Sequence, residues 1–333
     1  MKRANYLIEK IVDMDNLRLA FWKASKGKRW HKNVLDYQKD VEKNLLTLRT
    51  QILEDDLQVG NYYQFKIFDP KERLISASAF SEQVLHHALM NVCHFYFDRK
   101  QIYTSCASRK DKGTSFAIEQ AKKYTKKYAF FLKLDIKKYF DSIDHNVLKK
   151  QIRNMFKEEK LVGIFTLIID SYESEKGIKK GVPIGNLTSQ YFANSYLASL
   201  DHYIKEDLVC KGYVRYMDDM ILFDNELSTL KKSEKSIAYY LEKHLECSLK
   251  FSIFRKSKLG VPFLGYLILG THLRLLQKSK RRFLKKYKAI QATFKKGLNT
   301  EKQYQNRLSS LFVFIQKAKT KKMRKKILFL NTN

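Results

Sequence analysis

Two adjacent aspartates between two short β-prone stretches constrain this chain more than any other feature. Asp218 and Asp219 lie where the run GYVRYMDDMILF, residues 212–223, would turn as a hairpin. Apolar residues such as Ile221 and Leu222 indicate that the hairpin is built into a core. Adjacent carboxylates repel each other, so the pair needs water or a cation to neutralise it. A solvated turn and a divalent metal site are the two interpretations.

A third aspartate favours the metal site. The β-prone run FFLKL, residues 130–134, leads directly into Asp135, where a strand would give way to a turn. Three acids on two strands can hold hard cations. Mg²⁺ prefers oxygen ligands that it shares with substrate phosphates, and two such ions can clamp an in-line displacement. The pattern therefore predicts phosphoryl transfer at a site with two Mg²⁺ ions.

The charge of the chain indicates a polyanionic partner. Its 333 residues carry 65 Lys and Arg against 34 Asp and Glu, a formal net charge of +31. Residues 271–333 alone hold 19 basic residues and one acid, Glu301. A solvated tail or a membrane-surface helix would give a similar count. Phe283, Tyr287 and Ile290 recur at helical spacing, however, which favours a folded basic helix that binds nucleic acid.

Other features exclude several classes of protein. No apolar run reaches the roughly 18 residues of a membrane span, and the N-terminus has no secretory core, so a cytoplasmic protein is expected. The four cysteines have no metal-ligand spacing and are predicted to be reduced core thiols. His86 and His87 are interpreted as structural or RNA-facing residues.

The periodicity predicts an alternation of helices and strands. A hairpin is expected over residues 62–75 with its turn at 69–72, where Pro70 presets the backbone. Asp144 is expected to cap a helix that starts near His145. Further helices are predicted over residues 34–53, 80–97, 115–128 and 188–208.

With these elements in place, four motifs resemble those of reverse transcriptases. FLKLDIKKYF at 131–140 resembles the first catalytic motif, and YMDD at 216–219 matches the YxDD box, with Asp218 83 positions after Asp135. GVPIGNLTSQ at 181–190 lies between them, and FLGY at 263–266 resembles the primer-grip turn. The resemblance spans roughly residues 60 to 270 and implies an α+β right-hand polymerase with fingers, an antiparallel palm sheet and a thumb.

The resemblance and the charge distribution together suggest a division of the chain. Residues 1–60 are expected to form an N-terminal helical extension, residues 61–270 the fingers and palm, and residues 271–333 a basic helical thumb.

The middle motif points to a subfamily. Most relatives carry Gln-Gly…Ser-Pro there, whereas this chain has IGNLTSQ from Ile184 to Gln190, which resembles the reverse transcriptases of diversity-generating retroelements. Such enzymes copy a template repeat RNA into cDNA with errors at adenines for mutagenic retrohoming. A solitary or abortive-infection bacterial reverse transcriptase, and an RNA-binding scaffold without activity, remain alternatives.

The resemblance also implies roles for the acids. Asp135 and Asp218 hold the two magnesium ions with help from the backbone carbonyl of Ile136, and Asp219 contributes less directly. They favour attack of the primer 3′-hydroxyl on the α-phosphate of a deoxynucleoside triphosphate. Phe140, or Tyr139 if the turn is one residue shorter, would block a ribose 2′-hydroxyl.

Other residues would contact the substrate. Ile184 cannot hydrogen-bond as Gln does, so with Gln190 it is predicted to loosen base discrimination. Charged candidates for the triphosphate or pyrophosphate are Lys66, Arg73, Arg109 and Lys256.

The nucleic acid and a protein are the expected partners. Arg281, Arg282, Lys285 and Lys288 would follow the phosphates of template RNA and of the RNA/DNA hybrid. The family resemblance further implies a basic, pentameric accessory variability protein.

Overall fold

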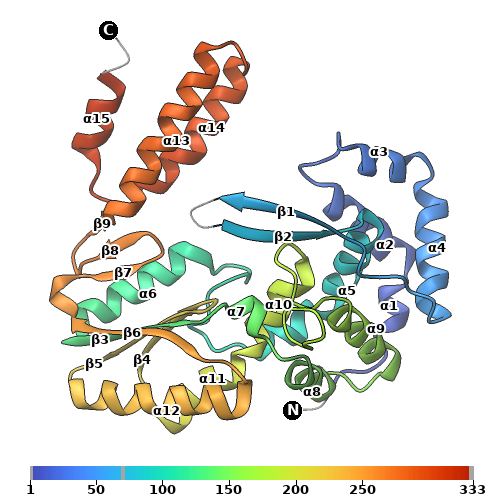
Figure 1. Cartoon of the computed structure of the whole chain (residues 1–333), viewed down its shortest axis with the longest axis horizontal. Helices are drawn as coiled ribbons and strands as arrows, with labels where there is room; N and C mark the ends of the chain where they lie inside the picture. The colour runs from blue at the N-terminus through green and yellow to red at the C-terminus, as the bar shows by residue number, and fades with distance from the viewer. Residues whose placement is uncertain (1–2, 69–71, 330–333) are drawn as a thin grey trace.

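An antiparallel sheet lies at the centre of the computed structural model, which describes residues 3–68 and 72–329. Helices from the N-terminal part of the chain lie to one side of it, and the C-terminal helices project from the other (Figure 1). Between them a two-stranded hairpin extends toward the C-terminal helices. The described residues include no helix that is long and apolar enough to span a membrane. The predicted α+β class is confirmed.

The N-terminal side is helical. Its elements are α1 (Ile8–Ile11), α2 (Met14–Ser25), α3 (Lys32–Lys39), α4 (Val41–Leu53) and α5 (Phe80–Arg99). The single helix predicted over residues 34–53 is wrong, because Asp40, at φ −130° and ψ 49°, lies outside the helical region and separates α3 from α4. The helix predicted over 80–97 is confirmed as α5. Helices α1, α2 and α4 share one hydrophobic core with α5, so residues 3–60 pack against the helices that follow them in the chain.

The projecting hairpin consists of β1 (Tyr62–Phe68) and β2 (Glu72–Ser78), paired antiparallel from Tyr62 opposite Ser78 to Phe68 opposite Glu72. The predicted hairpin is confirmed, while residues 69–71 of its turn lie outside the described residues. Most of β1 is exposed. The hairpin therefore extends into solvent from a base held by the helical lobe.

The central sheet has the strand order β4-β5-β3-β6, all antiparallel. Its strands are β3 (Phe130–Ile136), β4 (Gly212–Tyr216), β5 (Asp219–Asp224) and β6 (Leu249–Lys256). Side chains alternate between the two faces of β3. Leu132 and Leu134 belong to the hydrophobic core that also contains the N-terminal helices, whereas Phe131 packs on the opposite face with β7 and β8. Lys133 and Asp135 follow Phe131 on that second face and are polar, which marks where a site can form.

Helices connect the strands and cover the sheet. They are α6 (Gly113–Lys127), α7 (Tyr139–Ser142), α8 (His145–Met155), α9 (Glu159–Asp170), α10 (Leu187–Tyr196), α11 (Ala198–His202) and α12 (Leu227–Leu245). The helix predicted over 115–128 is confirmed as α6. Asp144 caps α8 as expected, since its Oδ1 accepts from the backbone N–H of Val147 at 3.0 Å.

The long helix predicted over residues 188–208 is wrong. The chain forms α10 and α11 instead, followed by a π-helical turn at Tyr203–Asp207. The break follows Tyr196, which is buried and whose hydroxyl donates to the backbone carbonyl of Leu245 at 2.6 Å. The four cysteines are buried free thiols, as predicted.

The C-terminal part has a small sheet and three basic helices. The elements are β7 (Val261–Phe263), β8 (Tyr266–Ile268), β9 (Leu273–Leu275), α13 (Gln277–Lys295), α14 (Glu301–Gln316) and α15 (Lys321–Phe329). The helices enclose a core of their own around Phe283, Tyr287 and Ile315. Strand β9 pairs with β8, so a boundary at residue 270 falls inside this sheet and the helical part begins at Gln277.

Candidate active site

The three aspartates come together at one end of two neighbouring strands. Strand β3 pairs with β5 up to Leu134 opposite Met220, and continuing this register brings Asp135 beside Asp219. Asp218 occupies the tight turn between β4 and β5, where Met217 has a positive φ of 54°. The Asp135 and Asp219 side chains are 22% and 25% exposed, so ligands can reach both. The sheet therefore presents these carboxylates as a group.

The negative charges of these carboxylates repel one another. Burial, followed by the charge of Asp135, raises the pKa of Asp218 to about 6. Burial also raises the pKa of Asp219 to about 6, against the opposing effect of Lys133. These raised pKa values mean that the cations and hydrogen-bond donors of the protein do not fully stabilise the ionised carboxylates. A bound cation would stabilise them.

Two lysines already supply part of this stabilisation. Lys133 Nζ lies 2.8 Å from a carboxylate oxygen of Asp219 and donates to the carbonyl of Pro262 at 2.9 Å. Lys250 Nζ lies 3.4 Å from Asp135 Oδ2. Sequence reasoning missed both. The signal for Lys133 was present, because it precedes Asp135 by two residues and alternation puts both side chains on one face.

The donor set fits a hard divalent cation. Within residues 3–68 and 72–329, no three or more His, Cys, Asp or Glu side chains converge closely enough to form a complete metal cage. Lys133 engages Asp219 and Lys250 lies beside Asp135, whereas the ionised form of Asp218 is destabilised by burial and by the charge of Asp135. Mg²⁺ is typically held by one or two carboxylates together with substrate phosphates, so an incomplete protein cage suits it.

A network of buried polar side chains holds the turn that carries Asp218. Arg215 and Asp201 are both fully buried, and Arg215 Nε donates to Asp201 Oδ1 at 2.7 Å. The same guanidinium donates to the carbonyl of Met217 at 3.1 Å and to Asn194 Oδ1 at 3.0 Å. Tyr213 donates to Asp201 at 2.7 Å. This network, which sequence reasoning also missed, ties the turn to α10 and α11.

The residues after Asp135 separate the two aromatic candidates. Tyr139 is buried and its hydroxyl donates to the backbone carbonyl of Ala193. Phe140 is only partly buried, and its carbonyl accepts from the N–H of Val182 at 2.9 Å. Phe140 is therefore the one of the two that keeps surface available to a substrate.

The loop that carries Ile184 lies against the projecting hairpin. The N–H of Ser76 on β2 donates to the carbonyl of Ile184 at 3.0 Å. Gly185 has φ +133°, a conformation that other residues rarely adopt, and a Cβ there would approach Ile75 Cγ2 to 3.2 Å, so the loop packs tightly against β2. Gln190 is exposed and accepts from Ser108 Oγ at 2.9 Å.

The basic candidates are dispersed. Lys66 lies opposite Leu74 and Arg73 opposite Ile67, so they project from alternate faces of the hairpin, and Lys66 pairs with Glu72 at 2.7 Å. Arg109 is mostly buried, with Nε 2.7 Å from Asp98 Oδ1 and Nη1 donating to two backbone carbonyls. In this conformation its hydrogen bonds hold the 98–109 region together.

Lys256 is not brought to the acids. Strand β6 pairs Lys256 with Phe130 and Phe251 with Asp135, so five residues, roughly 16 Å at about 3.3 Å each, separate Lys256 from the carboxylates. The lysine of β6 that lies beside Asp135 is Lys250.

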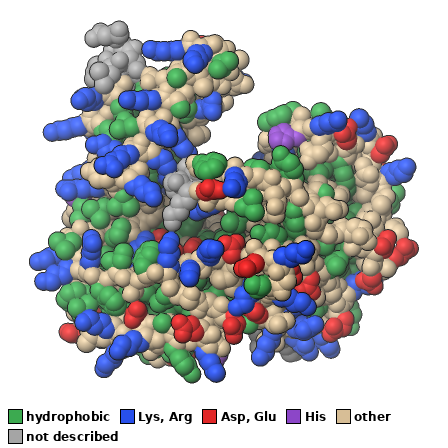
Figure 2. Space-filling model, viewed as in Figure 1, with side chains coloured by type: hydrophobic (Ala, Val, Ile, Leu, Met, Phe, Trp, Pro, Cys, Tyr) green, Lys and Arg blue, Asp and Glu red, His purple; other side chains and the backbone are tan. Residues whose placement is uncertain are grey.

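The C-terminal helices carry the exposed basic residues expected of them. Arg281, Lys285 and Lys288 are exposed on the side of α13 opposite the buried Phe283 and Tyr287. Arg282 is partly buried. Figure 2 shows many Lys and Arg side chains on this projecting part of the molecule.

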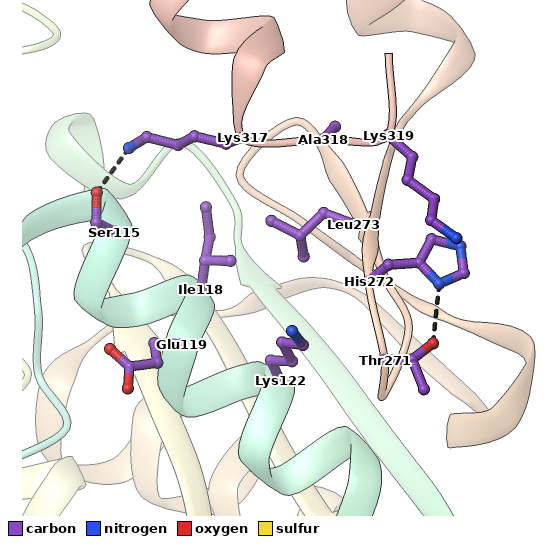
Figure 3. Close-up of a pocket in the computed structure, with 10 residues that line it drawn as sticks. All are labelled: Ser115, Ile118, Glu119, Lys122, Thr271, His272, Leu273, Lys317, Ala318 and Lys319. Carbon is purple, nitrogen blue, oxygen red and sulfur yellow. Dashed lines mark hydrogen bonds between the residues drawn. The ribbon is translucent and has the colours of Figure 1, made fainter. Parts of the chain in front are cut away.

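A separate pocket marks where these helices join the rest of the chain (Figure 3). It has a volume of about 620 Å³ and lies between α6, the start of β9 and the segment that links α14 to α15. Lys317 Nζ donates to Ser115 Oγ at 2.6 Å, and the N–H of Lys319 donates to the carbonyl of Leu273 at 2.9 Å. The first bond anchors the segment between α14 and α15 to α6, and the second anchors it to β9.

The family comparison covers the region that holds the acids. Residues 69–268 match the family described as reverse transcriptase (RNA-dependent DNA polymerase). This stretch begins in the projecting hairpin and ends with β8.

Curated relatives are distant. The chain is 21% identical over 285 residues to protein YkfC of Escherichia coli, a match that covers 71% of this chain and 73% of YkfC. It is 23% identical over 141 residues to a COX1/OXI3 intron 1 protein of Saccharomyces cerevisiae, covering 40% of this chain. The chain spans only 17% of the length of that yeast protein.

A solved structure shares the fold. Apo telomerase from Candida tropicalis superimposes with a TM-score of 0.51 at 14% identity, covering 67% of this chain and 49% of that one. This likeness supports a right-hand polymerase fold.

Proposed function

Because the chain belongs to the reverse transcriptase family of RNA-dependent DNA polymerases, we propose that it serves a diversity-generating retroelement. In this role it copies a template repeat RNA into cDNA, with errors at template adenines, for mutagenic retrohoming into a variable gene. The observation that carries the polymerase part is the convergence of Asp135 and Asp218 at the ends of neighbouring strands. The retroelement part depends on the IGNLTSQ motif at 184–190.

The acids have a defined role in this proposal. Asp135 and Asp218, together with the carbonyl of Ile136, would hold two Mg²⁺ ions, which when bound would supply positive charge for phosphoryl transfer. Asp219 contributes indirectly, since Lys133 already binds its carboxylate. The Arg215–Asp201 network fixes the turn that carries Asp218, so the carboxylate needs little rearrangement when the substrate binds.

Substrate selection follows from the residues around the acids. Phe140 excludes a ribose 2′-hydroxyl, which is consistent with its partly exposed ring beside buried Tyr139. Lys66 and Arg73 on the hairpin supply positive charge to the triphosphate. Lys250, rather than Lys256, is the β6 lysine placed to act near the departing pyrophosphate.

Base discrimination is assigned to the 184–190 loop. Ile184 uses its backbone carbonyl to bind Ser76 and offers the nascent base pair only an apolar side chain. Selection there rests on shape alone, which permits misincorporation. Gln190, whose side-chain oxygen accepts a hydrogen bond from Ser108, is assigned to the same surface facing the nascent base pair.

Nucleic acid and a protein partner complete the proposal. Arg281, Arg282, Lys285 and Lys288 on α13 contact the phosphates of template and hybrid, so binding is strong, salt-dependent and independent of sequence. A basic, pentameric accessory variability protein would bind with bridging RNA, because direct contact between two basic surfaces is unfavourable.

Sequencing of cDNA tests the proposal. The purified chain is given Mg²⁺, deoxynucleotides and the repeat RNA that flanks its gene, and the products are compared between wild type and Ile184→Gln. We expect cDNA with substitutions concentrated at template adenines, and fewer of them in the variant. Faithful copying, or DNA made without a template, would instead assign the chain to a solitary or antiviral reverse transcriptase.

Equal error spectra for wild type and Ile184→Gln would remove the role of Ile184 without removing the polymerase. Absence of any Mg²⁺-dependent synthesis, with RNA binding retained, would leave only a scaffold.

A further inference from the structure

A groove of about 940 Å³ lies between the start of α13 and α15. Its apolar side chains come from β9, α13 and α15, and they are Leu275, Leu284, Met323 and Ile327. All four belong to, or pack against, the small core around Phe283. Leu275, Leu284 and Met323 are only partly buried. The groove is therefore an open edge of the C-terminal core, where apolar surface meets solvent.

Basic side chains surround this apolar surface. Six of them border the groove, and all are exposed: Arg274, Lys280, Lys319, Lys321, Lys322 and Lys326. No Asp or Glu is among the described residues that line it. The one acid of residues 271–333, Glu301, begins α14 at the opposite end of α13 from the groove. The rim therefore carries positive charge that no nearby carboxylate of the groove offsets.

The lining favours a peptide over a nucleic acid. Unpaired bases bind by stacking on aromatic rings, and no aromatic side chain is among the described lining residues. The phosphates of a duplex gain nothing from contact with Leu and Met side chains. Such side chains instead bury the apolar face of an amphipathic helix, and Met adapts to the shape of that face. An acidic amphipathic protein segment matches both the apolar floor and the basic rim.

The groove also lies apart from the expected path of nucleic acid. Figure 1 shows α15 on the side of α13 and α14 away from the β1–β2 hairpin. On α13, Lys280 and Leu284 are four residues apart and share the side that lines the groove. Arg281 and Lys285, each one position further along, lie about 100° around the helix axis from them. Helix α13 therefore presents separate surfaces to two partners.

We propose that the groove between α13 and α15 is a docking site for an acidic amphipathic segment of another protein. The apolar side chains of that segment contact Leu284 and Met323, and its carboxylates pair with Lys280, Lys322 and Lys326. Because this partner is acidic, it is distinct from the basic accessory variability protein proposed above. The docking does not depend on polymerase activity.

Fluorescence anisotropy with a model peptide tests the docking. The probe is a labelled helical peptide of about 14 residues, with Leu at i, i+3, i+4 and i+7 and with Glu and Ala elsewhere. A second peptide has the same composition in an order that removes the apolar face. We expect the full chain to bind the first peptide at least about tenfold more tightly, because only that peptide presents apolar and acidic surfaces together. Equal affinities for the two peptides would overturn the proposal.

Matched charge reversals on α13 locate the bound peptide. Lys280→Glu should weaken peptide binding about tenfold, whereas Lys285→Glu, on the other side of the same helix, should weaken it less than about twofold. Met323→Ala should weaken binding several-fold, and Met323→Leu should bind like the parent because the two side chains have similar volumes. Circular dichroism checks that each variant is folded. Equal losses for Lys280→Glu and Lys285→Glu would show general attraction to a basic surface and would contradict the proposal.

Competition separates the two kinds of polyanion. Oligouridine of about 12 nucleotides should bind the chain without displacing the amphipathic peptide, because the two occupy different sides of α13. Displacement of the peptide by oligouridine would assign the groove to nucleic acid instead. These measurements need neither Mg²⁺ nor deoxynucleotides. A chain that binds the peptide but makes no cDNA would therefore defeat the polymerase proposal and leave the docking site standing.

Discussion

The two hairpins of this molecule have similar strand lengths and opposite surroundings. In the β4–β5 hairpin nearly every side chain is buried, and the exceptions gather at the acidic turn and at Asp224. In the β1–β2 hairpin the pattern is reversed, with most of β1 and the first half of β2 exposed. The buried hairpin can hold carboxylates in fixed positions, because its packing and the Arg215 network leave it one conformation. The exposed hairpin can contact ligands and move.

Because of this contrast, we expect the two hairpins to have different functions. Chemistry at Asp135 and Asp218 requires fixed geometry, whereas contact with nucleotides and template requires accessible surface. Substitutions in the buried hairpin should therefore alter catalysis or stability strongly, and those in the exposed hairpin should alter substrate binding with little effect on folding.

The largest expected effect is on catalysis at the buried hairpin. Asp218→Ala should lower Mg²⁺-dependent cDNA synthesis by roughly 10³-fold or more, because a lost metal ligand removes several kcal/mol of transition-state stabilisation. Asp224→Ala is the matched control, because Asp224 ends the strand that follows the Asp218 turn and pairs with Phe130. Circular dichroism and RNA binding should be unchanged in both. Synthesis by Asp218→Ala near the wild-type rate would defeat the catalytic assignment.

The next effect concerns stability. Arg215→Met leaves Asp201 buried without its partner and should lower the free energy of unfolding by about 3–5 kcal/mol, measured by urea denaturation. Adding Asp201→Leu should recover much of this loss, since no buried charge then remains. If the double variant folds well but polymerises slowly, the network positions the turn. A single variant as stable as wild type would contradict the burial argument.

The sequence predicted the local parts of both hairpins well. Alternation of apolar residues and the tight turns are encoded within a few residues, so the β4–β5 hairpin, α5 and the Asp144 cap were correctly placed. Breaks in helices were missed. Asp40 and the residues after Tyr196 follow helical spacing, and only packing against other elements separates the segments.

Contacts between distant strands were the least predictable. Which residue of β6 faces Asp135 depends on the register between β3 and β6, which no local pattern encodes. The sequence therefore predicts Lys256, whereas Lys250 is the residue beside Asp135. The buried Arg215–Asp201 pair was missed for the same reason, because 14 residues separate its members along the chain.

A smaller change, an increase in stability, is expected when Asp218 loses its charge. Burial raises the pKa of Asp218 from 3.8 to about 6, so ionisation of this carboxylate lowers the stability of the folded state progressively between these two pH values and by a constant amount above them. Without divalent cations, Asp218→Asn should therefore be more stable than wild type by about 1–2 kcal/mol at pH 7.5. The difference should shrink as the pH falls from about 6 toward 4, because Asp218 is then protonated in the folded state and, near 3.8, in the unfolded chain as well. Thermal unfolding in EDTA measures it, and a difference that does not depend on pH would point to packing instead.

The smallest change in stability is expected at the exposed hairpin. Lys66 is 62% exposed and pairs with Glu72 at the hairpin end, so Lys66→Ala should change the free energy of unfolding by less than about 0.5 kcal/mol. Its effect should appear in the KM for deoxynucleotides, which should rise several-fold with kcat nearly unchanged, because the lysine contributes binding and no chemistry. Glu72→Ala is the sharper comparison, since it breaks the same ion pair but leaves the cation in place. If Glu72→Ala raises the KM as much as Lys66→Ala, then hairpin geometry, and not charge on the triphosphate, determines nucleotide binding.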